Sequence, residues 1–379
     1  MAVVNRTPAR KQVVLIGAGH AHLHIALHAR SLLRCNAELV LIDPGDFWYS
    51  GLATGVLGGM YESDLDRVDP QPLVERLGGR FVRDRAVGLD RGTRTVRLAS
   101  GACLAYDLLS INVGSEIVVD DLAASRDRVW AVKPVSNLWR LRQHLESRFR
   151  EAPDVPVRIV VVGGGATGCE IAANIDALAR LHKRSVRVTL ITSSERLLAK
   201  QPRAAGRRLA DTLRRRGIEL ALSCRVERLA QDGVVANGRG FGADLVVLAT
   251  GLRAPRWLAE FGLPLDEEGS LRVGPTLQSI ADERIFGAGD CIRLEGHQLP
   301  KLGVFGVRQA PVLLHNLQAL LNGRPLQTFE PQKRCLMILN LGCGRALALW
   351  GPFHWQGRLS LWLKDVIDRR FLAKYHAAA

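Results

Sequence analysis

Apolar runs with strand character alternate with helical patterns along most of the chain. A buried strand pattern, a glycine turn, a helical pattern and a second strand pattern follow one another at 13–42 and again at 157–191, with helices expected at 21–33 and 167–182. Strands that alternate with helices are typical of α/β folds with parallel sheets, because the helices cover the faces of the sheet. The sequence therefore predicts two Rossmann-like dinucleotide-binding units.

Shorter patterns separate and follow these units. Alternating runs at 79–98 predict an antiparallel excursion, helical patterns occupy 137–150 and 356–375, and Pro153 and Pro156 mark a boundary before the second unit. We expect an FAD-binding domain interrupted by an NAD(P)H-binding domain and followed by a C-terminal segment with an amphipathic helix. The expected order is FAD domain first part, NAD(P)H domain, FAD domain second part and C-terminal segment, at 1–125, 126–275, 276–330 and 331–379.

The charge balance narrows the partners. The formal net charge is +15, from 52 basic and 37 acidic residues, and most of the basic residues are arginine. This excess attracts anionic groups such as phosphates or an acidic membrane surface. No long basic run or nucleic-acid-binding motif occurs, so we interpret the charge as a solvated arginine-rich surface and expect no nucleic acid partner.

The C-terminal helix pattern leaves two interpretations open. Apolar side chains recur at helical spacing at Leu359, Trp362, Leu363, Val366 and Ile367, with basic residues beside them. Such a helix can lie in an anionic membrane interface or dock on its own protein. No apolar stretch approaches the roughly 20 residues that span a bilayer. We expect a cytoplasmic protein, with peripheral attachment to the inner face of the cytoplasmic membrane as the alternative.

The first glycine turn, Gly17-Ala18-Gly19-His20, joins a buried strand to a helix. Glycines let the backbone approach a pyrophosphate, and the N-terminus of the helix offers N–H groups to it. Asp43 stands at the end of the next strand, where a carboxylate can accept hydrogen bonds from ribose hydroxyls. His22 replaces the third glycine of G-x-G-x-x-G, so the helix is expected to sit slightly further from the strand.

Histidine and cysteine patterns do not predict a metal or disulfide framework. His24 and His28 are one helical turn apart, but no acid or cysteine completes a ligand set, so no metal site is expected. The seven cysteines are widely spaced and form no C-x-x-C, which favours a reducing compartment. Cys169 is interpreted as a small packing residue, with a thiolate at a helix N-terminus as the alternative.

The second glycine turn carries the fuller pattern at Gly163, Gly165 and Gly168, with Thr167 inside it. The following strand ends in Ser193 and Ser194 where an NADH site usually has an acid, and Glu195 and Arg196 come next. Serines and arginine can accept the 2′-phosphate of NADPH. Alternatively, the site has decayed and binds neither coenzyme.

The order of these motifs resembles the two-dinucleotide-domain flavoprotein oxidoreductases of the pyridine nucleotide-disulfide oxidoreductase superfamily. Residues 106–115, 245–251 and 284–290 resemble the family's strand-plus-glycine segments, and the last of these implies that Asp290 bonds the ribityl chain of FAD. The resemblance implies FAD and NAD(P)H as cofactors. The expected cofactor-binding residues are Gly17, Ala18, Gly19, His20, Asp43, Ser50, Val87, Gly114, Gly163, Gly165, Thr167, Gly168, Gly251, Gly289 and Asp290.

Residues 163–170 are similar to the G-G-G-x-T-G-V-E of type II NADH dehydrogenases, which implies that Glu170 lies near flavin and nicotinamide. Residues 300–303 resemble the P-K-x-G of sulfide:quinone reductases, so Lys301 is a candidate flavin neighbour, with a surface lysine as the alternative. Residues 48–52, 132–134, 307–311 and 363–371 are similar to a subgroup often fused to selenide, water dikinase.

These resemblances favour hydride transfer from NAD(P)H to flavin and electron transfer to a quinone or similar acceptor, with Glu170 and Lys301 as candidate catalytic residues. Hydride transfer needs positioning more than an acid–base pair. One alternative is a sulfide:quinone-type enzyme, for which Cys169 and Cys343 are the cysteine pair to test. Another is a non-enzymatic flavin-bound redox sensor or membrane-surface protein.

Overall fold

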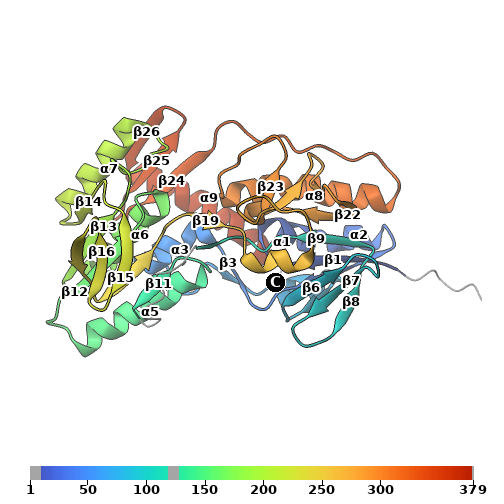
Figure 1. The fold of residues 1–379 in the computed structure, drawn as a ribbon, viewed down its shortest axis with the longest axis horizontal. Helices are drawn as coiled ribbons and strands as arrows, with labels where there is room; N and C mark the ends of the chain where they lie inside the picture. The colour runs from blue at the N-terminus through green and yellow to red at the C-terminus, as the bar shows by residue number, and fades with distance from the viewer. Residues whose placement is uncertain (1–9, 118–127, 378–379) are drawn as a thin grey trace, which may run out of the picture.

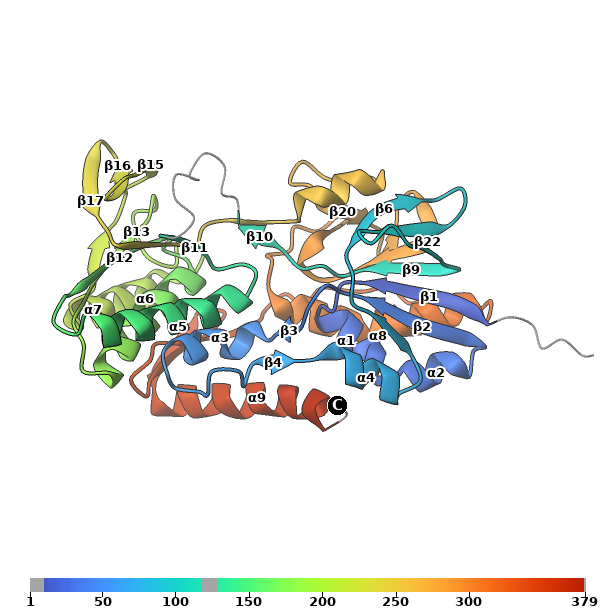
Figure 2. The same ribbon diagram turned by 90° about the horizontal axis from the view of Figure 1, so that it is seen from below.

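The structure is a computed structural model that describes residues 10–117 and 128–377, so the expected domain boundary between 125 and 126 lies outside the described residues. Two α/β lobes lie side by side (Figure 1). Figure 2 shows the C-terminal helix α9 running below the region where the lobes meet. Each lobe is built on one sheet with parallel central strands. The predicted α/β class with two Rossmann-like sheets and a C-terminal helix is confirmed.

The first lobe has an eight-stranded sheet in the order β23-β20-β21-β22-β9-β1-β2-β5. Its central strands are parallel, because β1 pairs with β2 and β9 in parallel and β22 pairs with β9 in parallel. The strands are β1 (Lys11–Ile16), β2 (Ala37–Ile42), β5 (Arg80–Val82), β9 (Leu108–Ile111), β20 (Leu271–Val273), β21 (Gln278–Ser279), β22 (Asp282–Gly287) and β23 (Ile292–Leu294). Its helices are α1 (His20–Leu27), α2 (Ala29–Leu33), α4 (Pro70–Arg76) and α8 (Gly303–Leu321).

The second lobe has a five-stranded parallel sheet in the order β11-β18-β12-β13-β14. Its strands are β11 (Val129–Ala131), β12 (Val157–Val162), β13 (Val186–Ile191), β14 (Glu219–Ala221) and β18 (Leu245–Leu248). Its helices are α5 (Ser136–Glu151), α6 (Ala166–Leu181) and α7 (Arg203–Arg215), and a small antiparallel sheet adds β15 (Val226–Ala230), β16 (Gly233–Ala236) and β17 (Arg239–Gly242).

Smaller elements connect and extend the lobes. The antiparallel excursion predicted for 79–98 is present as β6 (Ala86–Asp90), β7 (Thr95–Leu98) and β8 (Cys103–Ala105). The remaining elements are β3 (Phe47–Trp48), α3 (Ser50–Leu57), β4 (Arg67–Val68), β10 (Glu116–Ile117), β19 (Leu252–Arg253), η1 (Arg256–Phe261), η2 (Gly289–Cys291), β24 (Leu336–Asn340), β25 (Ala346–Trp350), β26 (Phe353–Gly357) and α9 (Arg358–His376).

Each of the two sheets has its own hydrophobic core. Helix α3 and strand β24 are not part of the second sheet, but they pack in its core. Ala53 and Leu57 of α3 pack in the core around β12, as do Leu339 of β24 and Leu341 just after it. The neighbouring Leu52 and Val56 of α3 pack in the core of the first lobe. The helix α3 therefore buries adjacent faces in the two cores and connects the lobes.

Two sequence expectations differ from the structure. The helix expected at 21–33 is broken at His28, which has φ −112° and ψ 18° and whose Nδ1 lies 2.8 Å from the carbonyl oxygen of His24. This side-chain contact ends α1 by competing with continued helical geometry. The division of the chain into domains stays a prediction, but β20 already lies in the first-lobe sheet before the expected boundary between 275 and 276.

Candidate functional site

The first glycine turn lies at the carboxyl end of β1. Gly17 has a φ of +90°, and a Cβ there would lie 2.5 Å from the carbonyl oxygen of Asn112. At the end of the adjacent β2, Asp43 Oδ2 accepts a 2.7 Å hydrogen bond from the backbone N–H of Ala18. Burial raises the pKa of Asp43, although this N–H and that of Gly45 favour its charged form. The turn and the predicted ribose carboxylate therefore meet.

His22 is part of the turn rather than a bulky replacement for glycine. The buried ring places Nδ1 2.6 Å from the Gly17 carbonyl oxygen and Nε2 2.8 Å from Ser110 Oγ. A carbonyl oxygen only accepts, so Nδ1 carries the proton and Nε2 accepts from the serine hydroxyl. Burial lowers the pKa of His22 to about 3, which keeps the ring neutral. His22 thus holds the shape of the first turn.

Asn112 connects three segments at this edge of the sheet. Its Oδ1 accepts a 3.0 Å hydrogen bond from the backbone N–H of Ala21, and its Nδ2 donates to the Ala288 carbonyl oxygen at 2.7 Å. Asn112 was not predicted as a site residue. The available signal was its position between the apolar strand and Gly114 in the segment 106–115, but no pattern indicated that its side chain turns toward the glycine turn.

Asp290 lies at the end of β22, next to that turn. Ser115 Oγ donates a 2.9 Å hydrogen bond to Asp290 Oδ2. Lys301 Nζ donates to the Asp290 carbonyl oxygen at 2.7 Å and to Ser270 Oγ at 3.0 Å. Lys301 is therefore half-buried beside the predicted FAD segment and stabilises its backbone, and its contact with the flavin ring stays a prediction.

An unpaired donor supports the fit of FAD to this edge. Gln309 of α8 is buried, its Oε1 accepts a 2.7 Å hydrogen bond from the Gly289 N–H, and its Nε2 has no partner among the described residues. A buried amide without a partner is costly, at roughly 1–3 kcal/mol. A dinucleotide lying along Gly289 and Asp290 offers such a partner. The glycine turn, the carboxylate of Asp43 and this donor together fit FAD.

The second glycine turn is sterically closed on one side and open on the other. A Cβ at Gly163 would lie 2.3 Å from the Ala249 carbonyl oxygen, and one at Gly168 would lie 1.9 Å from the Gly163 carbonyl oxygen. Gly165 has no atom within 4 Å of such a Cβ, and it and Thr167 are exposed at the N-terminus of α6. This arrangement leaves the helix N-terminus accessible to a phosphate.

The residue Glu170 of α6 is partly exposed, but protein atoms surround its carboxylate. Its Oε1 accepts hydrogen bonds from the Asn340 N–H at 2.7 Å and from Thr54 Oγ1 at 3.2 Å. Burial raises the pKa of Glu170, and the positive charge of Lys364 opposes this rise. Glu170 therefore links the second lobe to α3 and β24.

The structure agrees with the packing interpretation of Cys169 and contradicts the two alternatives that give Cys169 a chemical role. Cys169 is fully buried, burial raises the pKa of its thiol, and Sγ lies 3.6 Å from the Gly164 carbonyl oxygen, so the thiolate alternative is wrong. Gly342, next to exposed Cys343, packs on Ala177, eight residues along α6 from Cys169. At 1.5 Å per residue this separates the two by roughly 12 Å along the helix, so they do not form the pair that sulfide chemistry requires.

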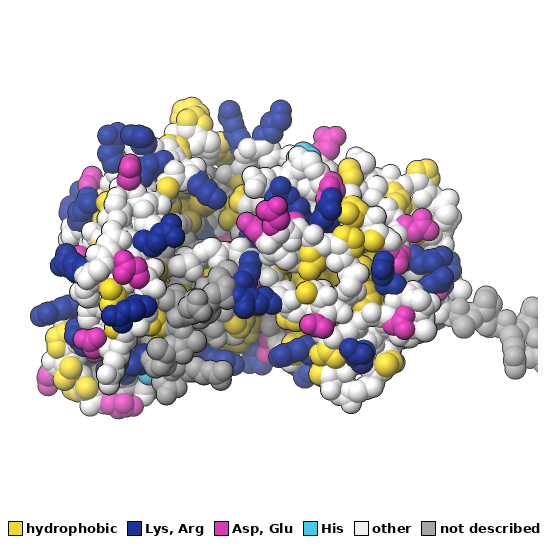
Figure 3. Space-filling model, in the orientation of Figure 1, with side chains coloured by type: hydrophobic (Ala, Val, Ile, Leu, Met, Phe, Trp, Pro, Cys, Tyr) yellow, Lys and Arg dark blue, Asp and Glu magenta, His cyan; other side chains and the backbone are white. Residues whose placement is uncertain are grey.

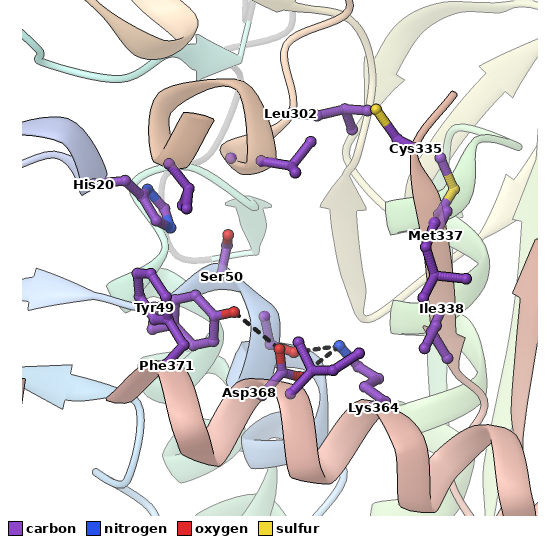
Figure 4. A pocket seen from close by; sticks show the side chains of 16 residues that line it. His20, Tyr49, Ser50, Leu302, Cys335, Met337, Ile338, Lys364, Asp368 and Phe371 are labelled. Carbon is purple, nitrogen blue, oxygen red and sulfur yellow. Dashed lines mark hydrogen bonds and ion pairs between the residues drawn. The ribbon is translucent and has the colours of Figure 1, made fainter. Parts of the chain in front are cut away.

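An apolar pocket of about 330 Å³ lies where α9, α8 and β24 face the first glycine turn. Figure 4 shows side chains from these elements converging on it. Only two of the sixteen lining residues, His20 and Ser50, were predicted from the sequence as site residues. The lining residues are His20, Tyr49, Ser50, Gly51, Leu302, Gly303, Val304, Val307, Cys335, Leu336, Met337, Ile338, Lys364, Ile367, Asp368 and Phe371.

One end of this pocket holds a polar triad, of which Lys364 and Asp368 are buried and Tyr49 is partly buried. Tyr49 OH donates a 2.9 Å hydrogen bond to Asp368 Oδ1, and Lys364 Nζ lies 2.9 Å from Asp368 Oδ2 and 2.7 Å from the Gly51 carbonyl oxygen (Figure 4). Burial and the carboxylate of Asp368 raise the pKa of the Tyr49 hydroxyl. The sequence marked the segments 48–52 and 363–371 only as similar to a subgroup, and folding brings them together.

An aromatic cluster adjoins this triad in the pocket wall. The Tyr49 and Phe371 rings stack with centroids 4.6 Å apart, and the His20 ring lies 5.0 Å from Phe47 in an edge-on arrangement. Burial lowers the pKa of His20 to about 4, so the imidazole is neutral at physiological pH. His20, expected at the phosphate turn, thus also faces the pocket.

Other predicted residues are spread along the sheet edges. Ser50 begins α3 and lines the pocket, while Val87 lies in β6 of the three-stranded antiparallel sheet. Gly114 and Gly251 follow β9 and β18, at the carboxyl ends of parallel strands. Within residues 10–117 and 128–377 no group of three or more His, Cys, Asp or Glu side chains could hold a metal ion.

Two glycine turns at the carboxyl ends of parallel strands in two sheets define a flavoprotein oxidoreductase that uses FAD and a nicotinamide dinucleotide. The pattern of the pyridine nucleotide-disulphide oxidoreductase family matches residues 11–312, most of the chain, and the chain belongs to this family.

Curated relatives align over most of their length. Ferroptosis suppressor protein 1 of Taeniopygia guttata is 28% identical over 84% of this chain and 83% of its own length. Demethylphylloquinone reductase of Synechocystis is 26% identical over 91% and 90%, respectively. A type II NADH:quinone oxidoreductase of Staphylococcus aureus is 23% identical over 96% of both chains.

Solved structures share the fold. The sulfide:quinone oxidoreductase of Aquifex aeolicus superposes with a TM-score of 0.82 over 97% of this chain and 92% of its own, at 20% identity. NDH2 of Plasmodium falciparum, solved in complex with NADH, gives a TM-score of 0.81 over 97% and 96%, at 14% identity. At these identities the likeness extends to the fold alone.

Proposed function

We propose that the chain is a type II NADH:quinone oxidoreductase-like flavoenzyme, which takes a hydride from NAD(P)H and passes electrons to a quinone. The observation that carries this proposal is the apolar pocket between α9, β24 and the first glycine turn. An apolar cavity with a few polar groups at one end suits a ring with carbonyl oxygens and a hydrophobic tail. The names of the relatives, two of which act on quinones, support it.

FAD would be held along the first-lobe sheet by the glycine turn, Asp43 and Asp290, with Gln309 supplying an unpaired donor. When bound, FAD would supply a two-electron carrier that connects a nicotinamide to a quinone. NAD(P)H would bind at the second turn, where the open N-terminus of α6 receives its pyrophosphate. Glu170 is proposed to lie near the nicotinamide, between both sites.

The triad at the pocket end would supply protons. Reduction of a quinone to a quinol takes up two protons with two electrons. The Lys364 ammonium has three N–H donors, and two of them are used by Gly51 and Asp368. The third N–H is available to a carbonyl oxygen in the pocket. Asp368 holds Lys364 in place and is itself fixed by the Tyr49 hydroxyl.

The test is an anaerobic titration of the FAD-loaded protein. Addition of NADH or NADPH should bleach flavin absorbance, and subsequent addition of quinones of increasing tail length should restore it. Sulfide serves as the matched alternative donor. If neither coenzyme bleaches the flavin at millimolar concentration, the hydride hypothesis is wrong. Bleaching by sulfide alone would instead support the sulfide:quinone alternative.

We propose further that the protein associates peripherally with the anionic inner face of the cytoplasmic membrane. Exposed aromatic and aliphatic side chains gather on β25, β26 and α9, and basic residues flank them on the helix. The exposed apolar residues are Trp350, Phe353, Trp355, Leu359, Trp362 and Ile367, and the basic ones include Arg358, Arg369, Arg370 and Lys374. We call this set the α9 surface.

Two observations connect the α9 surface to the pocket and to its charge. Ile367 is 44% exposed and also lines the pocket, so the pocket opens beside this surface and a lipid-dissolved quinone can reach it. The opposite face of α9, with Leu361, Lys364 and Leu372, is buried, so docking on the protein and membrane contact use different faces. No helix in the described ranges is long and apolar enough to cross a bilayer.

The basic side chains outside the α9 surface favour a solvated surface over a second binding site for an anionic partner. On the face shown in Figure 3, lysine and arginine side chains are interspersed with acidic ones. The resemblance to the subgroup often fused to selenide, water dikinase is retained as a proposal. It is supported by the contact between the segments 48–52 and 363–371, two of its marks, through Tyr49 and Asp368.

A further inference from the structure

The two dinucleotide units have the same strand register, so residues at equivalent positions after the second strand can be identified. In the first unit, β1 pairs in parallel with β2 so that Ile16 opposes Ile42, and Gly17 N–H donates to the Ile42 carbonyl oxygen at 2.8 Å. In the second, Val162 of β12 opposes Ile191 of β13, and Gly163 N–H donates to the Ile191 carbonyl oxygen at 2.8 Å.

This register makes Thr192 the counterpart of Asp43, because each is the first residue after the second strand. The sequence-based assignment of this position to Ser193 and Ser194 is therefore off by one residue. Thr192 is buried, and its Oγ1 accepts the backbone N–H of Ser194 at 3.3 Å. A carboxylate at this position accepts hydrogen bonds from both ribose hydroxyls and repels a 2′-phosphate. Thr192 does neither.

The cation proposed from the sequence is engaged elsewhere. Arg196 donates to the carbonyl oxygens of Leu198 and Ala199, so its guanidinium holds the backbone that follows β13. Ser193 is exposed and Ser194 is half-buried beside Thr192. The carboxylate of Glu195, three residues beyond Thr192, is exposed to solvent.

A second arginine lies on the segment that pairs with this turn. The backbone N–H of Ser223 donates to the Ser194 carbonyl oxygen at 3.0 Å, and that of Cys224 donates to the Thr192 carbonyl oxygen at 2.9 Å. Arg225, next along the chain, is exposed, and its guanidinium has no ion pair or hydrogen bond within the described residues. Asn237 fixes the Arg225 backbone through a 2.9 Å hydrogen bond to its N–H.

We propose that the second dinucleotide site selects NADPH over NADH, with Thr192 admitting the 2′-phosphate and Ser193, Ser194 and Arg225 receiving it. This inference rests on the proposed function only in taking the second turn as the coenzyme site. Arginine suits a phosphate because its planar fork donates two parallel hydrogen bonds. The two hydroxyls add neutral donors at the same turn.

The test measures binding of two fragments that differ only in the 2′-phosphate. Calorimetric titration of the FAD-loaded protein with adenosine 2′,5′-bisphosphate and with 5′-AMP should show at least tenfold tighter binding of the bisphosphate. Arg225→Ala should remove most of this difference and leave 5′-AMP affinity unchanged. Arg187→Ala, at the opposite end of β13 and also exposed, is the matched control and should behave as the unchanged protein.

Thr192→Asp tests the same position in the opposite direction. The introduced carboxylate should weaken bisphosphate binding at least tenfold and shift flavin reduction toward NADH, and retained FAD content and melting temperature check that the variant folds. Equal affinity for both fragments, tighter binding of 5′-AMP, or no binding of either overturns the inference. If the bisphosphate binds selectively but neither coenzyme bleaches the flavin, the proposed function fails and the inference stands.

Discussion

The hydroxyl of Tyr49 and the carboxylate of Asp368, which are 319 residues apart in the chain, form a 2.9 Å hydrogen bond inside the pocket. This bond fixes Asp368 on the helix α9, and Asp368 in turn holds the ammonium of Lys364. The C-terminal helix therefore completes a site whose other wall begins at residue 20.

Replacement of Lys364 should separate the two half-reactions. In Lys364→Met, the proton-bearing group at the pocket is lost, so quinone-dependent reoxidation should slow at least tenfold while flavin bleaching by coenzyme keeps its rate. Stopped-flow measurement of each half-reaction checks this. Lys374→Met, an exposed lysine on the same helix, should leave both rates unchanged. Equal slowing of both half-reactions would contradict a role confined to the pocket.

The variant should also be less stable. Lys364 and Asp368 have only 10% and 7% of their side chains exposed, and removal of one partner leaves a buried charge. Such losses cost roughly 3–5 kcal/mol. Denaturant unfolding of the holoprotein at neutral pH should show a loss of this order for Lys364→Met and little change for Lys374→Met.

Asp66 should make stability depend on pH. It is 1% exposed, its Oδ1 has no partner among the described residues, and burial raises its pKa from 3.8 to about 7. Because the folded state binds the proton more tightly, Asp66 contributes to stability at low pH, and this contribution is lost as pH rises from about 4 to 7. Relative to the unchanged protein, Asp66→Asn should gain about 3 kcal/mol between pH 4 and pH 7.

Denaturant midpoints of both proteins at several pH values within this window measure the difference. The comparison between the two cancels the other titrating groups, including Glu170 and Asp43, whose pKa values burial also raises. A difference that is constant from pH 4 to 7 would show that the carboxyl of Asp66 titrates normally in the folded state.

Two substitutions in the second glycine turn should separate effects on protein folding from effects on coenzyme binding. In Gly168→Ala the added Cβ would lie 1.9 Å from the Gly163 carbonyl oxygen, so the turn must shift and NAD(P)H-dependent bleaching should fall at least a hundredfold. FAD content should persist, because the first turn is untouched. Gly165→Ala meets no protein atom within 4 Å and should keep the melting temperature, while binding coenzyme more weakly through contact with its pyrophosphate.

The α9 surface should bind anionic vesicles. The double variant Leu359→Ser, Trp362→Ser removes two side chains that are 79% and 64% exposed, so it should reduce flotation with phosphatidylglycerol vesicles severalfold without loss of stability. Ile280→Ser, an exposed apolar residue on the first lobe, is the control. Equal flotation of all three proteins would assign membrane attachment, if any is measured, to another surface.

Local patterns were sufficient for much of the fold. The strands at 37–42, 157–162 and 186–191 were predicted with the bounds that the structure has, because buried parallel strands are continuous apolar runs bounded by turns. The break at His28 was missed, since it depends on where one side chain finds a hydrogen bond. The role of His22 was missed for the same reason, because its partner Ser110 comes from a distant strand.

The sequence by itself determined the two strand–glycine–helix units, the carboxylate at Asp43 and membership in a class of flavoproteins, because each depends on residues that are neighbours along the chain. Only the tertiary structure decided that Tyr49, Asp368 and Lys364 share a pocket and that Cys169 and Cys343 do not pair. It also decided that the Arg196 guanidinium donates to backbone carbonyl oxygens, whereas that of Arg225 has no partner among the described residues. These relationships depend on strand register and helix packing between segments that can be more than three hundred residues apart, and side-chain partners at that separation leave no local pattern.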